Sequence, residues 1–134
     1  MDALGHVNHA VYLNYLEQAR FEALEGAGVP FSRLVQEGWG IHVVRIEVDY
    51  RAECRMGDEL RVSTRADELR NSSMTIIQSL VRKDPAGETV EAVRARIVAV
   101  WVSANGRPTR IPDFVRKALS RPGPDPDGSG PPPT

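Results

Sequence analysis

The stretch DALGHVNHAVYLNYLEQAR, residues 2–20, combines two patterns that between them decide the fold. Its first half gathers side chains capable of chemistry, namely Asp2, His6, Asn8 and His9. Its second half places apolar residues at spacings of mostly three and four, which is the period of an amphipathic helix. The stretch therefore predicts a polar loop that leads directly into a helix.

The helical period continues beyond this stretch and predicts one long helix over residues 10–27. Asn8 is a suitable N-cap, because its side chain can accept a hydrogen bond from a free amide of the first turn. Gly26 or Gly28 is a suitable end, because glycine readily adopts the left-handed conformation that closes many helices. We expect this helix to bury one apolar face and to keep its charged side chains on the wetter side.

After the helix the apolar period changes to two, which is typical of half-buried β-strands. Turn residues separate four such segments, which are residues 40–52, 59–69, 73–83 and 89–103. The first segment slips in phase near Val44, which indicates a β-bulge. The short apolar–polar segment 31–37 is assigned to no helix or strand. A short terminal helix is predicted over residues 111–119, with Pro112 near its first turn.

This order of elements predicts an α+β architecture, in which an antiparallel four-stranded meander wraps the long helix. A sheet of four strands is too narrow to bury an apolar helix fully, so a fifth strand or a second subunit is expected. Residues 1–120 are predicted to form one domain. The remaining segment, RPGPDPDGSGPPPT at residues 121–134, is rich in proline and glycine, cannot bury a core, and is predicted to be a disordered tail.

Composition excludes several classes of protein. Hydrophobic residues make up 41% of the chain, and 17 basic residues oppose 18 acidic ones, so nothing favours a nucleic-acid or anionic-membrane partner. Cys54 is the single cysteine, which excludes an internal disulfide and a thiolate metal cluster. No apolar run approaches the roughly 20 residues of a membrane span, and there is no secretion signal, so a cytoplasmic location is expected.

The polar loop before the helix is suited to acyl-group hydrolysis. The first backbone amides of a helix lack internal partners and carry the positive end of the dipole, so they can stabilise an oxyanion near His9. Gly5 lets the loop double back, so that the carboxylate of Asp2 can face the same point. The residues alone also allow Asp2 to be a solvated terminal acid and the nearby histidines to be surface or cap residues. His6, His9 and distant His42 form no recognisable zinc-ligand set.

The pattern D-x-x-G-H-V-N-H-x-x-Y-L-x-Y-L-E-x-A-R at residues 2–20 resembles the signature of the hotdog-fold thioesterases of the 4-hydroxybenzoyl-CoA thioesterase type. The resemblance continues through V-x-Y-R-A-x-C-R-x-G-D-E-L at residues 48–60 and covers residues 2–120. It implies a hotdog fold, an antiparallel sheet wrapped around one long helix. It also implies hydrolysis of an acyl-CoA thioester without a metal or redox cofactor, CoA being part of the substrate.

The resemblance assigns roles at the start of the helix. Asp2 takes the position of the catalytic carboxylate, acting as nucleophile or as general base on water. His9 takes the position whose backbone amide polarises the thioester carbonyl. Gly5 shapes the turn between these two residues, and Tyr12 packs near the substrate pocket. His6 and Asn8 are expected to order the loop.

Other residues receive weaker assignments. Glu17 matches the glutamate of the helix motif, which looks structural. Basic side chains at the subunit boundary are implied to hold the phosphates of CoA, and the preferred pair is Arg82 and Lys83. The other candidates are Arg51, Arg55 and Arg70. The resemblance further implies a homodimer joined through the edge strand 40–52, and a homotetramer of two such dimers.

The sequence departs from the family pattern ahead of Asp2. The hotdog fold usually starts with a strand that runs into the catalytic loop, whereas only Met1 stands there in this sequence. We therefore expect either that the usual first strand is absent or that the recorded start lies downstream of the true one. Two alternative functions stay open: hydrolysis of acyl-carrier-protein thioesters, and non-catalytic binding of acyl-CoA.

Overall fold

The computed structural model describes residues 9–55 and 57–120, which form three helices and four strands. In chain order they are α1 (His9–Gly26), α2 (Phe31–Glu37), β1 (Gly40–Tyr50), β2 (Glu59–Leu69), β3 (Ser73–Lys83), β4 (Thr89–Val102) and α3 (Asp113–Leu119). The predicted long helix and four strands are confirmed to within about two residues, the usual spread of such boundaries. Predictions made for residues 1–8 and for the tail 121–134 lie outside the described residues.

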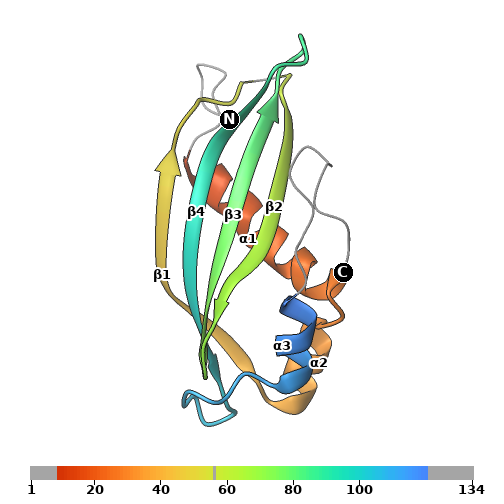
Figure 1. The fold of residues 1–134 in the computed structure, drawn as a ribbon, viewed down its shortest axis with the longest axis vertical. Coiled ribbons are helices and arrows are strands. Elements are labelled where there is room, and N and C mark those ends of the chain that lie inside the picture. Colours follow the sequence, from red (N-terminus) through yellow and green to blue (C-terminus); the bar gives the residue numbers. More distant parts are fainter. Residues whose placement is uncertain (1–8, 56, 121–134) are drawn as a thin grey trace.

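The strands form one antiparallel sheet in the order β1-β4-β3-β2 (Figure 1). β2, β3 and β4 are a meander, but β1 lies beside β4, with Gly40 opposite Val102 and Tyr50 opposite Val93. The predicted four-stranded meander was therefore wrong for β1. Periodicity shows which residues of a strand face the core, whereas it does not show which strand is the neighbour.

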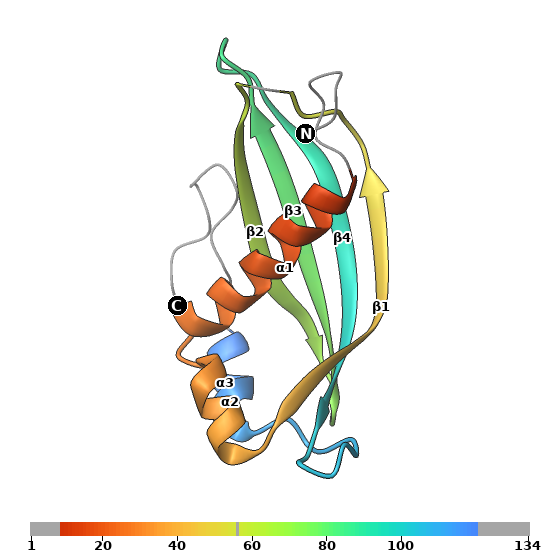
Figure 2. The ribbon, with the colours of Figure 1, turned by 180° about the vertical axis from the view of Figure 1, so that it is seen from behind.

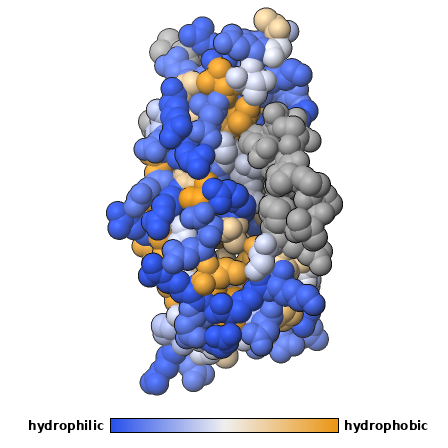
Figure 3. Space-filling model, viewed as in Figure 1, coloured by the Kyte–Doolittle hydropathy of each residue, from blue (hydrophilic) through white to orange (hydrophobic). Residues whose placement is uncertain are grey.

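α1 crosses one face of this sheet, as the view from behind shows (Figure 2). Alternate residues of β4 point towards that face and are buried; these are Val93, Ala95, Ile97, Ala99 and Trp101. The residues between them, such as Arg94 and Arg96, lie on the opposite face, which is largely hydrophilic (Figure 3). The alternation predicted for this strand is confirmed, and it makes the α1 side the core side.

The core consists of two clusters at opposite ends of α1. The first lies under the start of α1 and includes Tyr12, Leu16, Cys54, Leu80 and Ile97. The second joins the end of α1 to α2 and α3, and includes Val29, Leu34, Met74, Trp101, Ile111 and Val115. Ile76 is partly buried and packs against both clusters. Each end of the helix is thus anchored separately.

β1 is an edge strand with the predicted bulge. Its register against β4 shifts between Val43 and Arg45, which places Val44 outside the ladder. The strand also exposes large apolar side chains, including Ile46 and Tyr50. Such an edge is a ready surface for another strand.

Two details of the helices differ from prediction. α2 was not predicted, because its seven residues bury only Leu34 and are too few to show a repeating apolar pattern. It ends at Gly38, whose positive φ of 76° lets its amide return to the carbonyls of the last turn. α3 starts at Asp113, so that Pro112 is its N-cap. None of the helices in the described part of the chain is both long and apolar enough to span a membrane.

Candidate active site

The start of α1 meets the end of β1 and the segment that follows it. α1 begins at His9, so its first backbone amides, which have no acceptor within the helix, lie at this end. The rings of Tyr12 and Tyr50 lie 5.8 Å apart and join the first turn of α1 to the last residue of β1. The predicted role of His9 requires only its backbone amide. Asp2 and Gly5 lie outside the described residues.

Tyr12 fastens this junction from within the core. Its side chain is 3% exposed, and its hydroxyl oxygen accepts a hydrogen bond of 3.1 Å from the backbone N–H of Cys54. Burial raises the pKa of Tyr12 to about 12, so the phenol is neutral at physiological pH. Tyr12 therefore holds the segment after β1 against the first turn of α1, and its predicted contact with substrate stays a prediction.

Arg82 and Lys83 lie on opposite faces of β3. Arg82 stands opposite Leu60 on the face that points to α1, whereas the adjacent Lys83 is exposed. Burial raises the pKa of the Cys54 thiol, and the positive charge of Arg82 acts in the opposite direction, which places Arg82 near Cys54. The Nε of Arg82 is buried and has no hydrogen-bond partner among the described residues. Only Arg82 of the predicted pair thus faces the helix start.

The other phosphate-binding candidates already have carboxylate partners. Arg51 pairs with Glu91 at 2.9 Å, Arg70 with Glu68 at 3.1 Å, and Arg55 lies 3.7 Å from Glu53. These arginines are exposed, and exposed ion pairs contribute little stability. Their pairing therefore leaves them available to an incoming phosphate.

A buried polar network under the middle of α1 was missed by the sequence analysis. Gln78 is fully buried; its Nε2 donates to the carbonyl of Leu16 at 2.8 Å and to Oγ1 of Thr64 at 3.0 Å. Its Oε1 accepts a hydrogen bond of 2.9 Å from Arg20. Burial lowers the pKa of Arg20, and the nearby Glu17 carboxylate raises it. The signal was present, since Gln78 stands between the apolar Ile76 and Leu80 in the row of β3 that faces α1.

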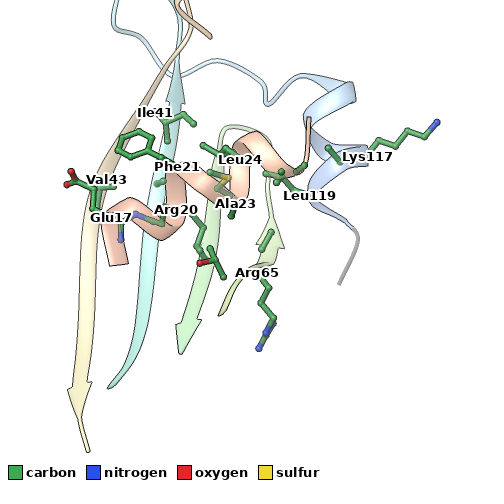
Figure 4. Close-up of a pocket in the computed structure, with 18 of the residues that line it drawn as sticks. Glu17, Arg20, Phe21, Ala23, Leu24, Ile41, Val43, Arg65, Lys117 and Leu119 are labelled. Atoms are coloured by element: carbon green, nitrogen blue, oxygen red, sulfur yellow. The ribbon is translucent and has the colours of Figure 1, made fainter. Parts of the chain in front are cut away.

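Beyond this network, a cavity of about 840 Å³ lies between the second half of α1, the sheet and α3 (Figure 4). Glu17 and Arg20 line the part nearest the start of α1, and Leu119 of α3 lines the far part. Glu17 therefore belongs to the cavity wall, and nothing places it beside the first turn of α1. In residues 9–55 and 57–120 there is no group of three or more His, Cys, Asp or Glu that is arranged to hold a metal ion.

Residues 1–119 match the family model described as the thioesterase-like superfamily. The chain belongs to this superfamily. The fold agrees: 4-hydroxybenzoyl-CoA thioesterase from Pseudomonas sp. strain CBS-3 superposes with a TM-score of 0.81 at 23% identity, over 88% of this chain and 89% of that one. The predicted hotdog fold and family resemblance are thus confirmed.

Curated relatives of this thioesterase-like chain include enzymes acting on two kinds of thioester. The long-chain acyl-CoA thioesterase FadM of Escherichia coli is 30% identical over 67% of each chain. The chloroplastic acyl-acyl carrier protein thioesterase ATL3 of Arabidopsis thaliana is 28% identical over 87% of this chain. The matched region spans 60% of the length of ATL3.

Proposed function

We propose that this protein hydrolyses an acyl-CoA thioester to the free acid and CoA. The observation that carries the proposal is that α1 begins at His9, directly after the polar stretch at residues 2–8 of the sequence, so that the positive end of the helix dipole follows that stretch. Membership of the thioesterase-like superfamily and the similarity to an E. coli acyl-CoA thioesterase support the same reaction.

In this mechanism the thioester carbonyl accepts a hydrogen bond from the His9 amide, which stabilises the oxyanion by on the order of 10²–10³-fold in rate. The Asp2 carboxylate either activates a water molecule or attacks the carbonyl itself. As a positioned base it contributes about 10²–10⁴-fold. The tetrahedral intermediate then expels the CoA thiolate, which takes up a proton. Where Asp2 is the nucleophile, water then hydrolyses the acyl–Asp2 anhydride to the free acid and restores the carboxylate. The scheme needs no metal or redox cofactor, and CoA enters only as part of the substrate.

Four further residues support the reaction. Gly5 shapes the turn between Asp2 and His9, and Tyr12, whose hydroxyl holds the backbone of Cys54, packs near the substrate pocket. Arg82, which faces the helix start, binds the CoA portion of the substrate. Lys83, which is exposed on the opposite face of β3, meets the CoA phosphates as a solvated charge.

The second candidate substrate is the same acyl group carried on an acyl carrier protein. The 28% identity to ATL3 over 87% of this chain favours it specifically. The chemistry is unchanged, but the carrier protein must dock beside the site. Rates measured with one acyl group on both carriers distinguish the two substrates.

The active form is a homodimer joined through β1, and two dimers form a homotetramer. The exposed apolar side chains of this edge strand support the pairing. The expected cytoplasmic location, and the expected lack of nucleic-acid and membrane partners, stay predictions.

The proposed function is tested by hydrolysis of short, long and aromatic acyl-CoA thioesters, followed with a thiol reagent. Asp2→Asn is expected to lower kcat by about 10²–10⁴-fold, because the amide cannot act as base or nucleophile. Asp67→Asn is the matched control, since Asp67 makes only an exposed ion pair with Arg65 and its loss should leave kcat unchanged. The proposal fails if no thioester is cleaved on either carrier, or if Asp2→Asn matches the wild type. Binding of acyl-CoA without hydrolysis would instead support the non-catalytic alternative.

A further inference from the structure

The cavity under the second half of α1 has the size of a ligand site. Its volume of about 840 Å³ falls within the range of roughly 300–1,000 Å³ that is usual for small-molecule pockets. It borders the second core cluster, on the side where Ile41 and Val43 of β1 face Phe21 of α1 (Figure 4). Residues of every strand contribute to its wall.

The cavity changes from polar to apolar along its length. Its polar side chains are gathered at one end, where Glu17 and Arg20 of α1 lie near Thr64. The far part is lined by apolar side chains: Leu24, Met74, Ile76, Ala99, Phe114 and Leu119. Arg65 and Lys117 also belong to the wall, but their side chains extend away from the cavity (Figure 4). A group that reaches the far part therefore finds no hydrogen-bonding side chain there among the described residues that line it.

α3 closes the far end and is firmly attached. Phe114 lies under the guanidinium of Arg33, 3.8 Å from its carbon to the ring centroid. Val115 is fully buried in the second core cluster. Arg116 donates to the backbone carbonyls of Arg70, Asn71 and Ile111. A wall fixed in this way limits how far a bound chain can extend.

The cavity begins about two turns after the start of α1. Glu17, at the near end of the cavity, follows His9 by eight residues, which is about 12 Å along the helix axis. Leu13, which is 41% exposed, lies within this interval of α1 and offers an apolar surface to an acyl chain. A short acyl group held at the helix start ends before the cavity, whereas a long one enters it.

We infer that the cavity binds the terminal part of a long, straight, unsubstituted acyl chain, and that α3 is the wall that limits its length. The inference rests on the proposed thioesterase function, which places the thioester at the start of α1. An acyl group with a hydroxyl or carboxyl group at its far end is disfavoured, because that group would lose its hydrogen bonds to water without gaining partners.

The test compares kcat/KM for acetyl-, octanoyl-, lauroyl- and palmitoyl-CoA, and for an aromatic acyl-CoA, all below the concentration at which micelles form. The wild type should prefer the lauroyl and palmitoyl thioesters. Ala23→Leu adds bulk to the cavity wall and should lower kcat/KM for palmitoyl-CoA by on the order of tenfold relative to octanoyl-CoA. Ala19→Leu, the same change on a half-buried residue of the same helix outside the cavity wall, should leave this ratio unchanged.

A second variant works in the opposite direction. Leu119→Ala removes bulk from the end wall and should move the preference towards chains longer than palmitoyl. The inference is overturned, while the proposed function stands, if the wild type prefers acetyl or aromatic thioesters or if Ala23→Leu lowers all rates equally. If no thioester is cleaved, the inference is tested by the rise in Tm on binding of non-hydrolysable S-alkyl-CoA. A larger rise with hexadecyl-CoA than with ethyl-CoA, lost in Ala23→Leu, supports binding of a long chain in the cavity. Equal rises with the two ligands overturn the inference.

Discussion

Tyr12 and Gln78 fasten α1 to the rest of the fold through buried hydrogen bonds at two points along the helix. The Tyr12 hydroxyl accepts a hydrogen bond from the Cys54 amide at the first turn, and Gln78 donates one to the carbonyl of Leu16 one turn later. A buried amide or carbonyl that loses its partner costs more than a hydrogen bond contributes when formed. These two side chains therefore set the position of the helix start, where the proposed oxyanion donor lies.

Removing the Tyr12 hydroxyl should destabilise the protein without emptying the core. Tyr12→Phe keeps the ring against Tyr50 but leaves the buried Cys54 N–H without this acceptor, so we expect the free energy of unfolding to fall by about 1–3 kcal/mol. Urea denaturation measures the change. Tyr15→Phe, at a side chain 46% exposed, is the control and should unfold like the wild type. A Tyr12→Phe protein as stable as that control would show that the bond contributes nothing.

Comparison of the wild type with Tyr12→Phe also predicts how the free energy of unfolding changes with pH. Below pH 10 the Tyr12 phenol is protonated in both the folded and the unfolded chain, so it adds no pH dependence there. Between about pH 10 and 12 the unfolded chain loses this proton while the folded one keeps it, because burial raises the pKa of Tyr12 to about 12. Wild-type stability should therefore fall across this window by on the order of 1 kcal/mol more than that of Tyr12→Phe. Parallel curves would contradict the assignment.

The side chain of Arg116 ties α3 to the backbone of neighbouring segments. The guanidinium of Arg116 donates through Nε to the carbonyl of Ile111 at 3.2 Å and through Nη2 to the carbonyls of Arg70 and Asn71. Lysine cannot reproduce this fork, so Arg116→Lys should lower stability by about 1–3 kcal/mol and speed hydrogen exchange within α3. Arg107→Lys, at an exposed position, is the matched control. Unchanged exchange in α3 would show that the Arg116 hydrogen bonds do not anchor it.

A helix or strand could be predicted from the sequence when its apolar pattern repeats several times. α1 and the four strands each repeat their apolar pattern often enough to be recognised, and the slip at Val44 correctly marked a bulge. α2 buries only Leu34, so its period could not be seen. The place of β1 beside β4 depends on long-range packing of the sheet against α1, which no local pattern records.

For the whole molecule, the motif at residues 2–20 predicted the superfamily, and with it the fold, but only part of the candidate site. The helix start at His9 lies where the motif implied, while Arg82 and Lys83 diverge because adjacent strand residues face opposite sides. The cavity could not be predicted, since its wall is drawn from all four strands and from two of the helices. Gln78 could have been noticed as a polar residue within an apolar row.

The edge formed by β1 carries the last prediction, which concerns assembly. β1 pairs with β4 on one side, and no other strand of residues 9–55 and 57–120 pairs with its second side. If two copies join there, Val44, which is 61% exposed, becomes buried. Val44→Lys should then raise the dimer dissociation constant by about tenfold or more, because a lysine on the edge opposes strand pairing.

Val35→Lys is a close control for that variant, because Val35 is 62% exposed and lies on α2, away from the strand edge. Sedimentation velocity over a range of concentrations measures both proteins beside the wild type. The edge assignment requires Val44→Lys to dissociate at concentrations where Val35→Lys and the wild type remain dimeric. A monomeric wild type, or equal dissociation of the two lysine variants, would exclude β1 as the interface, because the same charge at the same exposure would then act without regard to the strand.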